Sequence, residues 1–143
     1  MGNVPLGSYA MPGQNTGDDT DDVDWDFVAE LVVAQTADAT LVLRVNWPSG
    51  LSNVQVTIQV PDEASMGTGT ISPAQAGQSI TTGTSHTRFT HPAAAQGDVI
   101  TYTLPVTADA TGSVGLTFKV EAAELSAPFV RSQSTEFVES QGA

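Results

Sequence analysis

The feature that most constrains the fold is a strict alternation of apolar and polar residues with a period of two. In the clearest run, four aliphatic residues alternate with polar ones until Pro61 stops the pattern: Val54, Val56, Ile58 and Val60. Alternate side chains of a β-strand point to opposite faces of its sheet, so this segment is predicted as a strand with one buried face.

Four other segments show the same spacing and are also predicted as strands. Their apolar faces hold Trp25, Phe27, Leu31 and Val33 in the first, Leu41, Leu43, Val45 and Trp47 in the second, Ile100, Tyr102, Leu104 and Val106 in the third, and Val114, Leu116, Phe118 and Val120 in the fourth. Together with the first run, these faces are the predicted core.

The remaining segments are less regular. Between residues 62 and 97, glycines and prolines leave only short apolar pieces, around Ile71, Ile80 and Phe89, so short edge strands and long loops are expected there. The segment from Ala108 to Gly112 is short enough to be a hairpin connection. The segment from Pro128 to Phe137 is expected to be an edge strand or a tail that pairs elsewhere.

The strand count and the chain length together predict the fold class. No segment has helical spacing over a useful length, and 143 residues fit one domain better than two. An all-β, immunoglobulin-like antiparallel β-sandwich of about seven to eight strands is therefore predicted for residues 25–143. Strand count alone does not distinguish it from an up-and-down or jelly-roll barrel.

Residues 1–24 are predicted to form an extended arm, rich in glycine and proline and then in aspartate. This arm has no apolar periodicity of its own, yet it carries four apolar side chains: Val4, Leu6, Tyr9 and Met11. Extended segments of this kind can lie across a neighbouring subunit and add hydrogen bonds to its sheet edge. These four residues are therefore the predicted partner-binding residues.

The charge excludes two classes of partner. The formal net charge is −12, which repels nucleic acid phosphates and anionic lipid headgroups, so neither nucleic acid nor a membrane is an expected partner. The chain also shows no signal-peptide core and no stretch of membrane-spanning length.

Catalytic and metal chemistry find little support in the residues. The two histidines, His86 and His91, fall in a Thr-rich segment and are predicted as solvent-facing loop residues; a triad with Ser85 lacks the Gly-x-Ser-x-Gly elbow. There is no cysteine and no His-Glu-x-x-His motif for zinc. No enzyme activity and no cofactor are predicted.

Calcium and carbohydrate sites are weaker alternatives. Asp22, Asp24 and Asp26 have the spacing of a calcium loop, but the glycine and the closing acid that such a loop needs are missing. Two alternatives remain for this segment: a solvated acidic linker, or an irregular calcium site over Asp18 to Asp24. The aromatic residues fall in phase with core residues, and only Trp47, at a strand end, is a candidate for stacking on a sugar.

Two segments carry a resemblance to a known class of domains. The stretches NVQVTIQVP at 53–61 and GDVITYTLPVTADATGSVGLTFKV at 97–120 resemble the strands of immunoglobulin-like modules in prokaryotic surface proteins and tailed-phage virion proteins. Antibody domains place a tryptophan between two bridged cysteines, and this chain does not. The resemblance therefore extends to the architecture alone.

The resemblance implies a non-enzymatic virion structural protein, specifically a capsid decoration (cement) protein on the capsid surface. Its expected partners are the major capsid protein and copies of itself, with a homo-oligomer as one form. The alternatives are an extracellular adhesion or fibre module at the cell surface and a carbohydrate-binding module.

Overall fold

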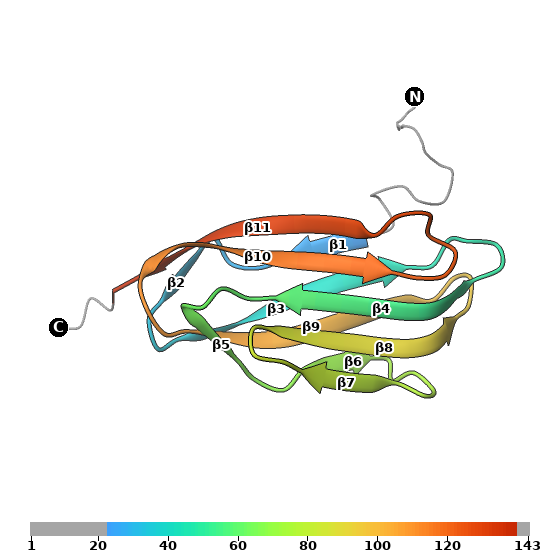
Figure 1. The fold of residues 1–143 in the computed structure, drawn as a ribbon, viewed down its shortest axis with the longest axis horizontal. Helices are drawn as coiled ribbons and strands as arrows, with labels where there is room; N and C mark the ends of the chain where they lie inside the picture. Colours follow the sequence, from blue (N-terminus) through green and yellow to red (C-terminus); the bar gives the residue numbers. More distant parts are fainter. Residues whose placement is uncertain (1–22, 140–143) are drawn as a thin grey trace, which may run out of the picture.

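The computed structural model describes residues 23–139, which form two packed β-sheets (Figure 1). The five-stranded sheet runs in the order β1-β3-β9-β5, with β6 also paired to β9. Its strands are β1 (Val23–Asp26), β3 (Thr36–Arg44), β5 (Ala64–Met66), β6 (Thr70–Ser72) and β9 (Val99–Ala108).

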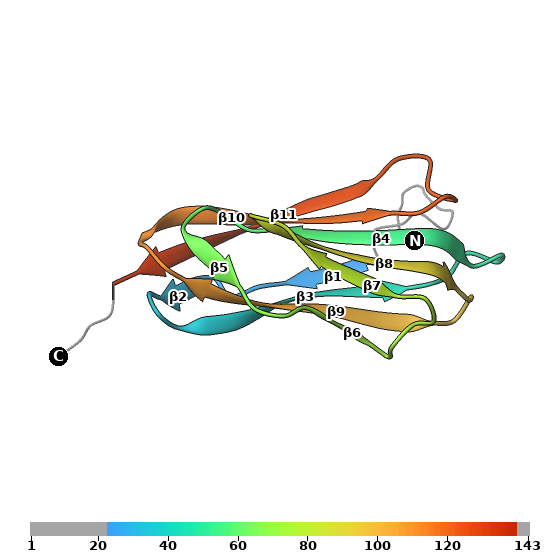
Figure 2. The same ribbon diagram turned by 60° about the horizontal axis from the view of Figure 1, so that its bottom comes forward.

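The six-stranded sheet runs in the order β2-β11-β10-β4-β8-β7. Its strands are β2 (Glu30–Val32), β4 (Leu51–Gln59), β7 (Ser79–Thr82), β8 (His86–Ala94), β10 (Gly112–Glu121) and β11 (Phe129–Val138). Figure 2 shows the two sheets as separate layers, with β4, β10 and β11 in the upper layer and β3, β6 and β9 in the lower one. The predicted all-β sandwich is confirmed, and no helix occurs in the described part of the chain. It has eleven strands in place of the seven to eight expected, because the irregular segments form additional short strands.

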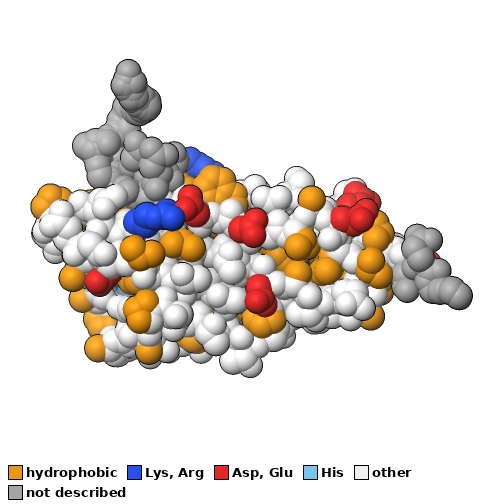
Figure 3. Space-filling model, turned by 180° about the vertical axis from the view of Figure 1, so that it is seen from behind, with side chains coloured by type: hydrophobic (Ala, Val, Ile, Leu, Met, Phe, Trp, Pro, Cys, Tyr) orange, Lys and Arg blue, Asp and Glu red, His pale blue; other side chains and the backbone are white. Residues whose placement is uncertain are grey.

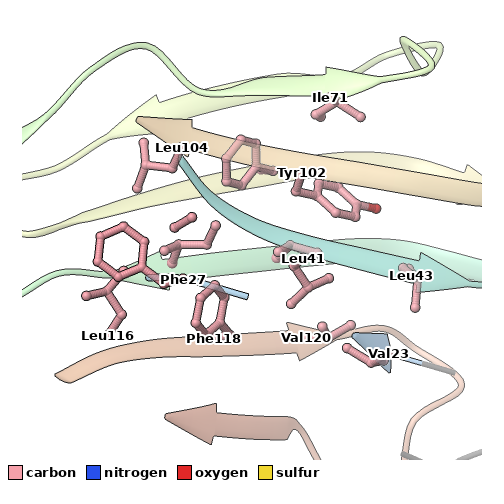
Figure 4. Packing of buried hydrophobic residues seen from close by; sticks show 14 of the residues in the cluster. Val23, Phe27, Leu41, Leu43, Ile71, Tyr102, Leu104, Leu116, Phe118 and Val120 are labelled. Carbon is pink, nitrogen blue, oxygen red and sulfur yellow. The ribbon is translucent and has the colours of Figure 1, made fainter. Parts of the chain in front are cut away.

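The core lies between the sheets and is built from the predicted apolar faces. Val54, Val56 and Ile58 on β4 are buried, as are Leu116 and Phe118 on β10. Figure 4 shows Leu41 and Tyr102 from one sheet and Phe118 from the other packed in the same layer. Each strand turns its apolar face to this layer because side chains alternate along it, so the predicted phase is confirmed.

The prediction of one strand over Trp25 to Val33 is wrong. Two strands occur there: β1 pairs with β3 in the five-stranded sheet, and β2 pairs with β11 in the other. The chain crosses between the sheets after Asp26, and Phe27 is buried at the crossing. The β2–β11 pair is parallel, so the sandwich is not wholly antiparallel.

The segment from Ala108 to Gly112 is not a hairpin connection. It joins β9 of the five-stranded sheet to β10 of the six-stranded sheet. A short connection can reverse the chain within one sheet or cross from one sheet to the other. The length of the connection therefore does not distinguish a hairpin from a crossing between sheets.

The region 62–97 contains the short strands β5, β6 and β7, as predicted, but also one long strand. This strand, β8, has nine residues and pairs with β4 along most of its length. Its inward-facing residues include Thr87 and His91 beside Phe89, and these polar side chains concealed the alternation. The final strand, β11, pairs with β10 over Phe129 to Phe137 and is not a tail.

The four predicted partner-binding residues of the arm, Val4, Leu6, Tyr9 and Met11, lie outside the described residues. The first described strand begins at Val23. Within residues 23–139 there is no helix of the length and hydropathy that crossing a membrane requires.

Candidate functional site

His91 lies inside the core and not in a solvent-facing loop as predicted. It is on β8, and its side chain is only 2% exposed. Its Nε2 atom lies 2.6 Å from the hydroxyl of Tyr102 on β9, and its Nδ1 atom lies 3.0 Å from the Ala93 carbonyl. Because β8 and β9 belong to different sheets, this contact links the two layers of the sandwich.

The partners of His91 determine its protonation. A carbonyl oxygen can only accept, so Nδ1–H donates to Ala93, and Nε2 then accepts the proton of the Tyr102 hydroxyl. Burial lowers the pKa of His91, although the Ala93 carbonyl and the charge of Asp98 act in the opposite direction. Burial also raises the pKa of Tyr102 well above its ordinary value. Both groups are therefore neutral near pH 7.

This arrangement leaves His91 unsuited to the catalytic triad considered from the sequence. Both of its ring nitrogens are occupied, by Ala93 and Tyr102, so neither is available to activate the Ser85 hydroxyl. His86 lies half-buried near the start of the same strand, opposite Gln59. The side-chain period would have placed His91 in the core, because it follows Phe89 by two residues.

The acidic residues that the structure describes do not form a metal site. Asp24 on β1 makes an ion pair with Arg44 on β3, and Asp26 is exposed. Among residues 23–139 no three His, Asp or Glu side chains lie close enough to hold a metal ion. Asp18 and Asp22 lie outside that range, so the calcium alternative stays a prediction.

A groove opens at one end of the sandwich, between the two sheets. It has a volume of about 240 Å³. Its lining includes apolar residues from both sheets and one cation: Val23, Leu43, Trp47, Leu125, Phe129 and Arg131. We call it the end groove. Trp47, predicted to emerge at a loop, is half-buried in its wall.

One wall of the end groove is the loop between β10 and β11, which is tied to β4. The carboxylate of Glu124 accepts hydrogen bonds from the Ser52 amide at 2.8 Å and from the Ser52 hydroxyl at 2.7 Å. These two donors lower the pKa of Glu124. The amide of Ala123 also donates to the Ser52 carbonyl at 2.9 Å, so three hydrogen bonds hold the loop in place.

Aromatic rings and a guanidinium group fill the space between β1 and β11 beside the groove. The Arg131 guanidinium carbon lies 4.4 Å from the ring centre of Phe129 and 5.7 Å from that of Trp25. The two rings pack edge to face with their centres 5.7 Å apart. Trp25 faces inward as predicted, but β1 is an edge strand and Trp25 remains half-buried, whereas Tyr102 and Phe118 are fully buried.

One edge of β11 is largely without a strand partner. On one side β11 pairs with β10 from Phe129 to Phe137, but on the other it pairs with β2 only over Glu136–Val138. Residues 129–135 therefore have no strand partner on this side within the described chain, and we call them the open edge of β11. Figure 1 shows β11 at the upper border of its sheet.

The backbone groups on the open edge belong to even-numbered residues. The Glu136 amide donates across this edge to the Ala29 carbonyl, and the direction of N–H and C=O groups alternates along a strand. Side chains already hold two of the carbonyls: Arg131 donates to Val130 at 2.8 Å and Gln133 to Ser134 at 3.3 Å. Ser132, between them, presents both its N–H and its C=O.

The opposite face of the molecule offers no comparable feature. Figure 3 shows the side formed by the five-stranded sheet, where apolar side chains occur in small groups separated by polar and scattered charged ones. A continuous apolar patch would indicate an interface, and this face does not show one. We therefore take the open edge and the end groove as candidate sites within residues 23–139.

No protein-family model matches this chain, and neither does any curated protein. Solved structures do resemble it. A cohesin module from a Clostridium perfringens family 33 glycoside hydrolase matches with a TM-score of 0.61 and 9% identity, covering 83% of this chain and 97% of that one.

Two further cohesins are similar. The cohesin–dockerin complex Coh-OlpA-Doc918 from Clostridium thermocellum gives a TM-score of 0.53 at 7% identity over 81% of this chain and 99% of that one. The seventh ScaB type I cohesin from Pseudobacteroides cellulosolvens gives 0.52 at 13% identity over 78% and 88%. At such identities the likeness extends to the fold alone. All three are cohesin modules and none is a capsid protein, so the expected immunoglobulin-like architecture is supported and the phage assignment is not.

Proposed function

We propose that this chain is a non-catalytic protein-binding module that takes up an extended segment of a partner protein on the open edge of β11. The observation that carries the proposal is the unpaired side of β11 over residues 129–135, the first part of a strand that is paired with β10 from Phe129 to Phe137 on its other side. An extended peptide that adds to a sheet edge gains main-chain hydrogen bonds, and its alternate side chains meet the neighbouring surface.

The surroundings of the edge favour a specific partner over indiscriminate pairing. Arg131 and Gln133 hold two of its carbonyls, so an incoming strand must replace these side-chain donors with its own amides. Natural sheets use charged edge residues to discourage unspecific strand addition. A partner that also satisfies the Arg131 guanidinium, through an acidic side chain, would compensate for this displacement.

A protein of similar fold offers a precedent for protein binding. The Clostridium thermocellum structure is a complex of a cohesin with a dockerin, so that β-sandwich binds a protein partner. The absence of catalysis is supported by the engagement of His91 with Tyr102 and Ala93 in the core.

The finer proposal is that the partner is a major capsid protein and that the chain decorates a virion surface, alone or with copies of itself. It rests on the resemblance of the strand segments to virion modules. Purified native particles provide the test: many symmetry-arranged copies per particle would support it, and a chain found on cells without particles would favour the adhesion alternative.

The strand-addition proposal is tested by Ser132→Pro, with Ser132→Ala as the matched control. Proline removes the amide that faces away from β10, and an edge strand tolerates it because the β10 ladder loses no bond. We expect the proline variant to fold, yet to be recovered in the native assembly at least about tenfold less, since one lost hydrogen bond and the ring's bulk together exceed 1.4 kcal/mol. Equal recovery of the two variants would refute the proposal.

Hydrogen exchange supplies an independent measurement. The amides of Val130, Ser132 and Ser134 should exchange faster in the isolated chain than in the assembly, whereas the neighbouring amides that pair with β10 should be protected in both. Unchanged exchange at all three amides would contradict strand addition.

A further inference from the structure

We infer that the end groove is occupied by the apolar stretch Val4–Met11 of the same chain's arm. The groove shares Phe129 and Arg131 with the open edge of β11, but its inferred occupant is the chain's own arm and not a partner protein. The inference therefore goes beyond the proposed function, and because its test needs no partner it can fail separately.

The arm joins the domain beside the end groove. Val23 is the first described residue, and its side chain lines the end groove, so the 22 residues before it join the domain at the groove wall. A chain spans up to about 3.3 Å per residue, so the residues between Met11 and Val23 reach up to roughly 40 Å. That length suffices to reverse direction and return to a groove beside its own attachment point.

The second argument is chemical fit. The groove is lined largely by the apolar side chains of Leu43, Trp47, Leu125 and Phe129. Its volume of about 240 Å³ exceeds that of engineered apolar cavities of about 150 Å³ that bind benzene, so it can take an aromatic ring or aliphatic side chains. The stretch Val4–Met11 offers both kinds, and each apolar side chain removed from water stabilises the docked state.

The third argument is charge. Asp18, Asp19, Asp21 and Asp22 precede Val23 directly, and the groove contains one of only four basic residues in the chain, Arg131. The guanidinium group has five N–H donors, and the Val130 carbonyl accepts from only one of its nitrogens. Arg131 is therefore able to pair with an aspartate of the acidic run while the apolar stretch enters the groove.

The same charge favours the chain's own arm over that of a second copy. Two copies each carry a formal net charge of −12 and repel one another. A tethered segment instead meets its groove at an effective concentration in the millimolar range, without any encounter between molecules.

The experiment uses the full chain and the absence of cysteine. Because there is no native thiol, Ser8→Cys gives a single position for a nitroxide spin label in the middle of the stretch. In molecules that carry both the label and nitrogen-15, we expect strong loss of NMR signal for the Trp47 indole N–H and for the amides of Leu125 and Phe129. The amides of Thr81 and Thr82 on β7, at the far edge of the six-stranded sheet, serve as the reference.

A mixed sample distinguishes the two sources of the segment. When spin-labelled chains without nitrogen-15 are mixed with nitrogen-15 chains without a label, the signals of the end groove should keep their intensity. Signal loss in the mixed sample would overturn the inference in favour of a second copy, and no loss in either sample would remove the arm from the groove.

Two variants show whether the apolar side chains are responsible. Replacing Leu6, Tyr9 and Met11 by serine in the labelled chain should restore the groove signals without changing the melting temperature of the sandwich by more than a few degrees. Signal loss that persists in this variant would overturn the inference. Asn3→Ser, directly before the stretch, is the matched control and should leave the loss intact. Neither measurement involves a partner protein, so the outcome is independent of strand addition on β11.

Discussion

Removing the Tyr102 hydroxyl measures what the buried contact with His91 contributes to stability. In Tyr102→Phe the ring stays, and with it the edge-to-face packing against Phe89, whose ring centre lies 5.6 Å away. The change leaves the Nε2 atom of His91 without a donor in a site that is 2% exposed. A buried polar atom without its partner costs about 1–3 kcal/mol, and we expect the free energy of unfolding to fall by that amount.

Urea denaturation with two variants provides the assay. The midpoint should shift to lower urea in Tyr102→Phe while the dependence on urea stays unchanged, because the surface exposed on unfolding is the same. The double variant with His91→Leu removes both polar partners and should recover part of the loss, because no buried ring nitrogen is then unsatisfied and the carbonyl of the exposed residue Ala93 can accept from water. A single variant within a few tenths of a kcal/mol of the parent, with no gain in the double variant, would refute the assigned hydrogen bond.

Three further outcomes are expected. The pKa of His91 in the folded chain lies below its ordinary value of 6.5, so the unfolded chain takes up this proton first as the pH falls. The free energy of unfolding should therefore decrease below about pH 6.5. Urea titrations between pH 7 and 5 measure this decrease, and the contribution of His91 to it should be absent in His91→Gln. Ile58→Ala should cost about 2–5 kcal/mol by lost burial and a residual cavity; a melting temperature within a degree of the parent would contradict the assigned core. Chelators should leave the melting temperature unchanged, and a rise of many degrees in millimolar calcium would make Asp22, Asp24 and Asp26 ligands.

The sequence predicts which side chains face the core but not which sheet carries them. Both sheets turn an apolar face to the same layer, so alternation looks identical on β1 and β2, although these strands lie in different sheets. The same ambiguity explains the segment between β9 and β10, which crosses the sandwich. The sequence alternation does not reveal β8 because two of its inward-facing residues are polar. Thr87 and His91 lie two residues before and after Phe89, so all three side chains point to the core although only one of them is apolar.

The candidate sites depend on contacts that no local pattern contains. The stacking of Arg131 on Phe129 and Trp25 requires β1 and β11 to face one another across the sandwich, although they are about a hundred residues apart in the chain. The open edge of β11 exists because β1 joins the five-stranded sheet and only β2 joins β11. Such features follow from topology, which alternation of residues does not determine.

The parallel pairing of β2 with β11 also determines how the domain bears mechanical load. These are the first and last strands of their sheet along the chain, and they run in the same direction. Tension between residues 23 and 139 pulls them in opposite senses along their length, so the bonds from Glu136 to Ala29 and from Thr135 to Val28 are sheared together and not opened one by one. This short patch, together with the β1–β3 pair that precedes it in the chain, therefore bears the load before the rest of the sandwich.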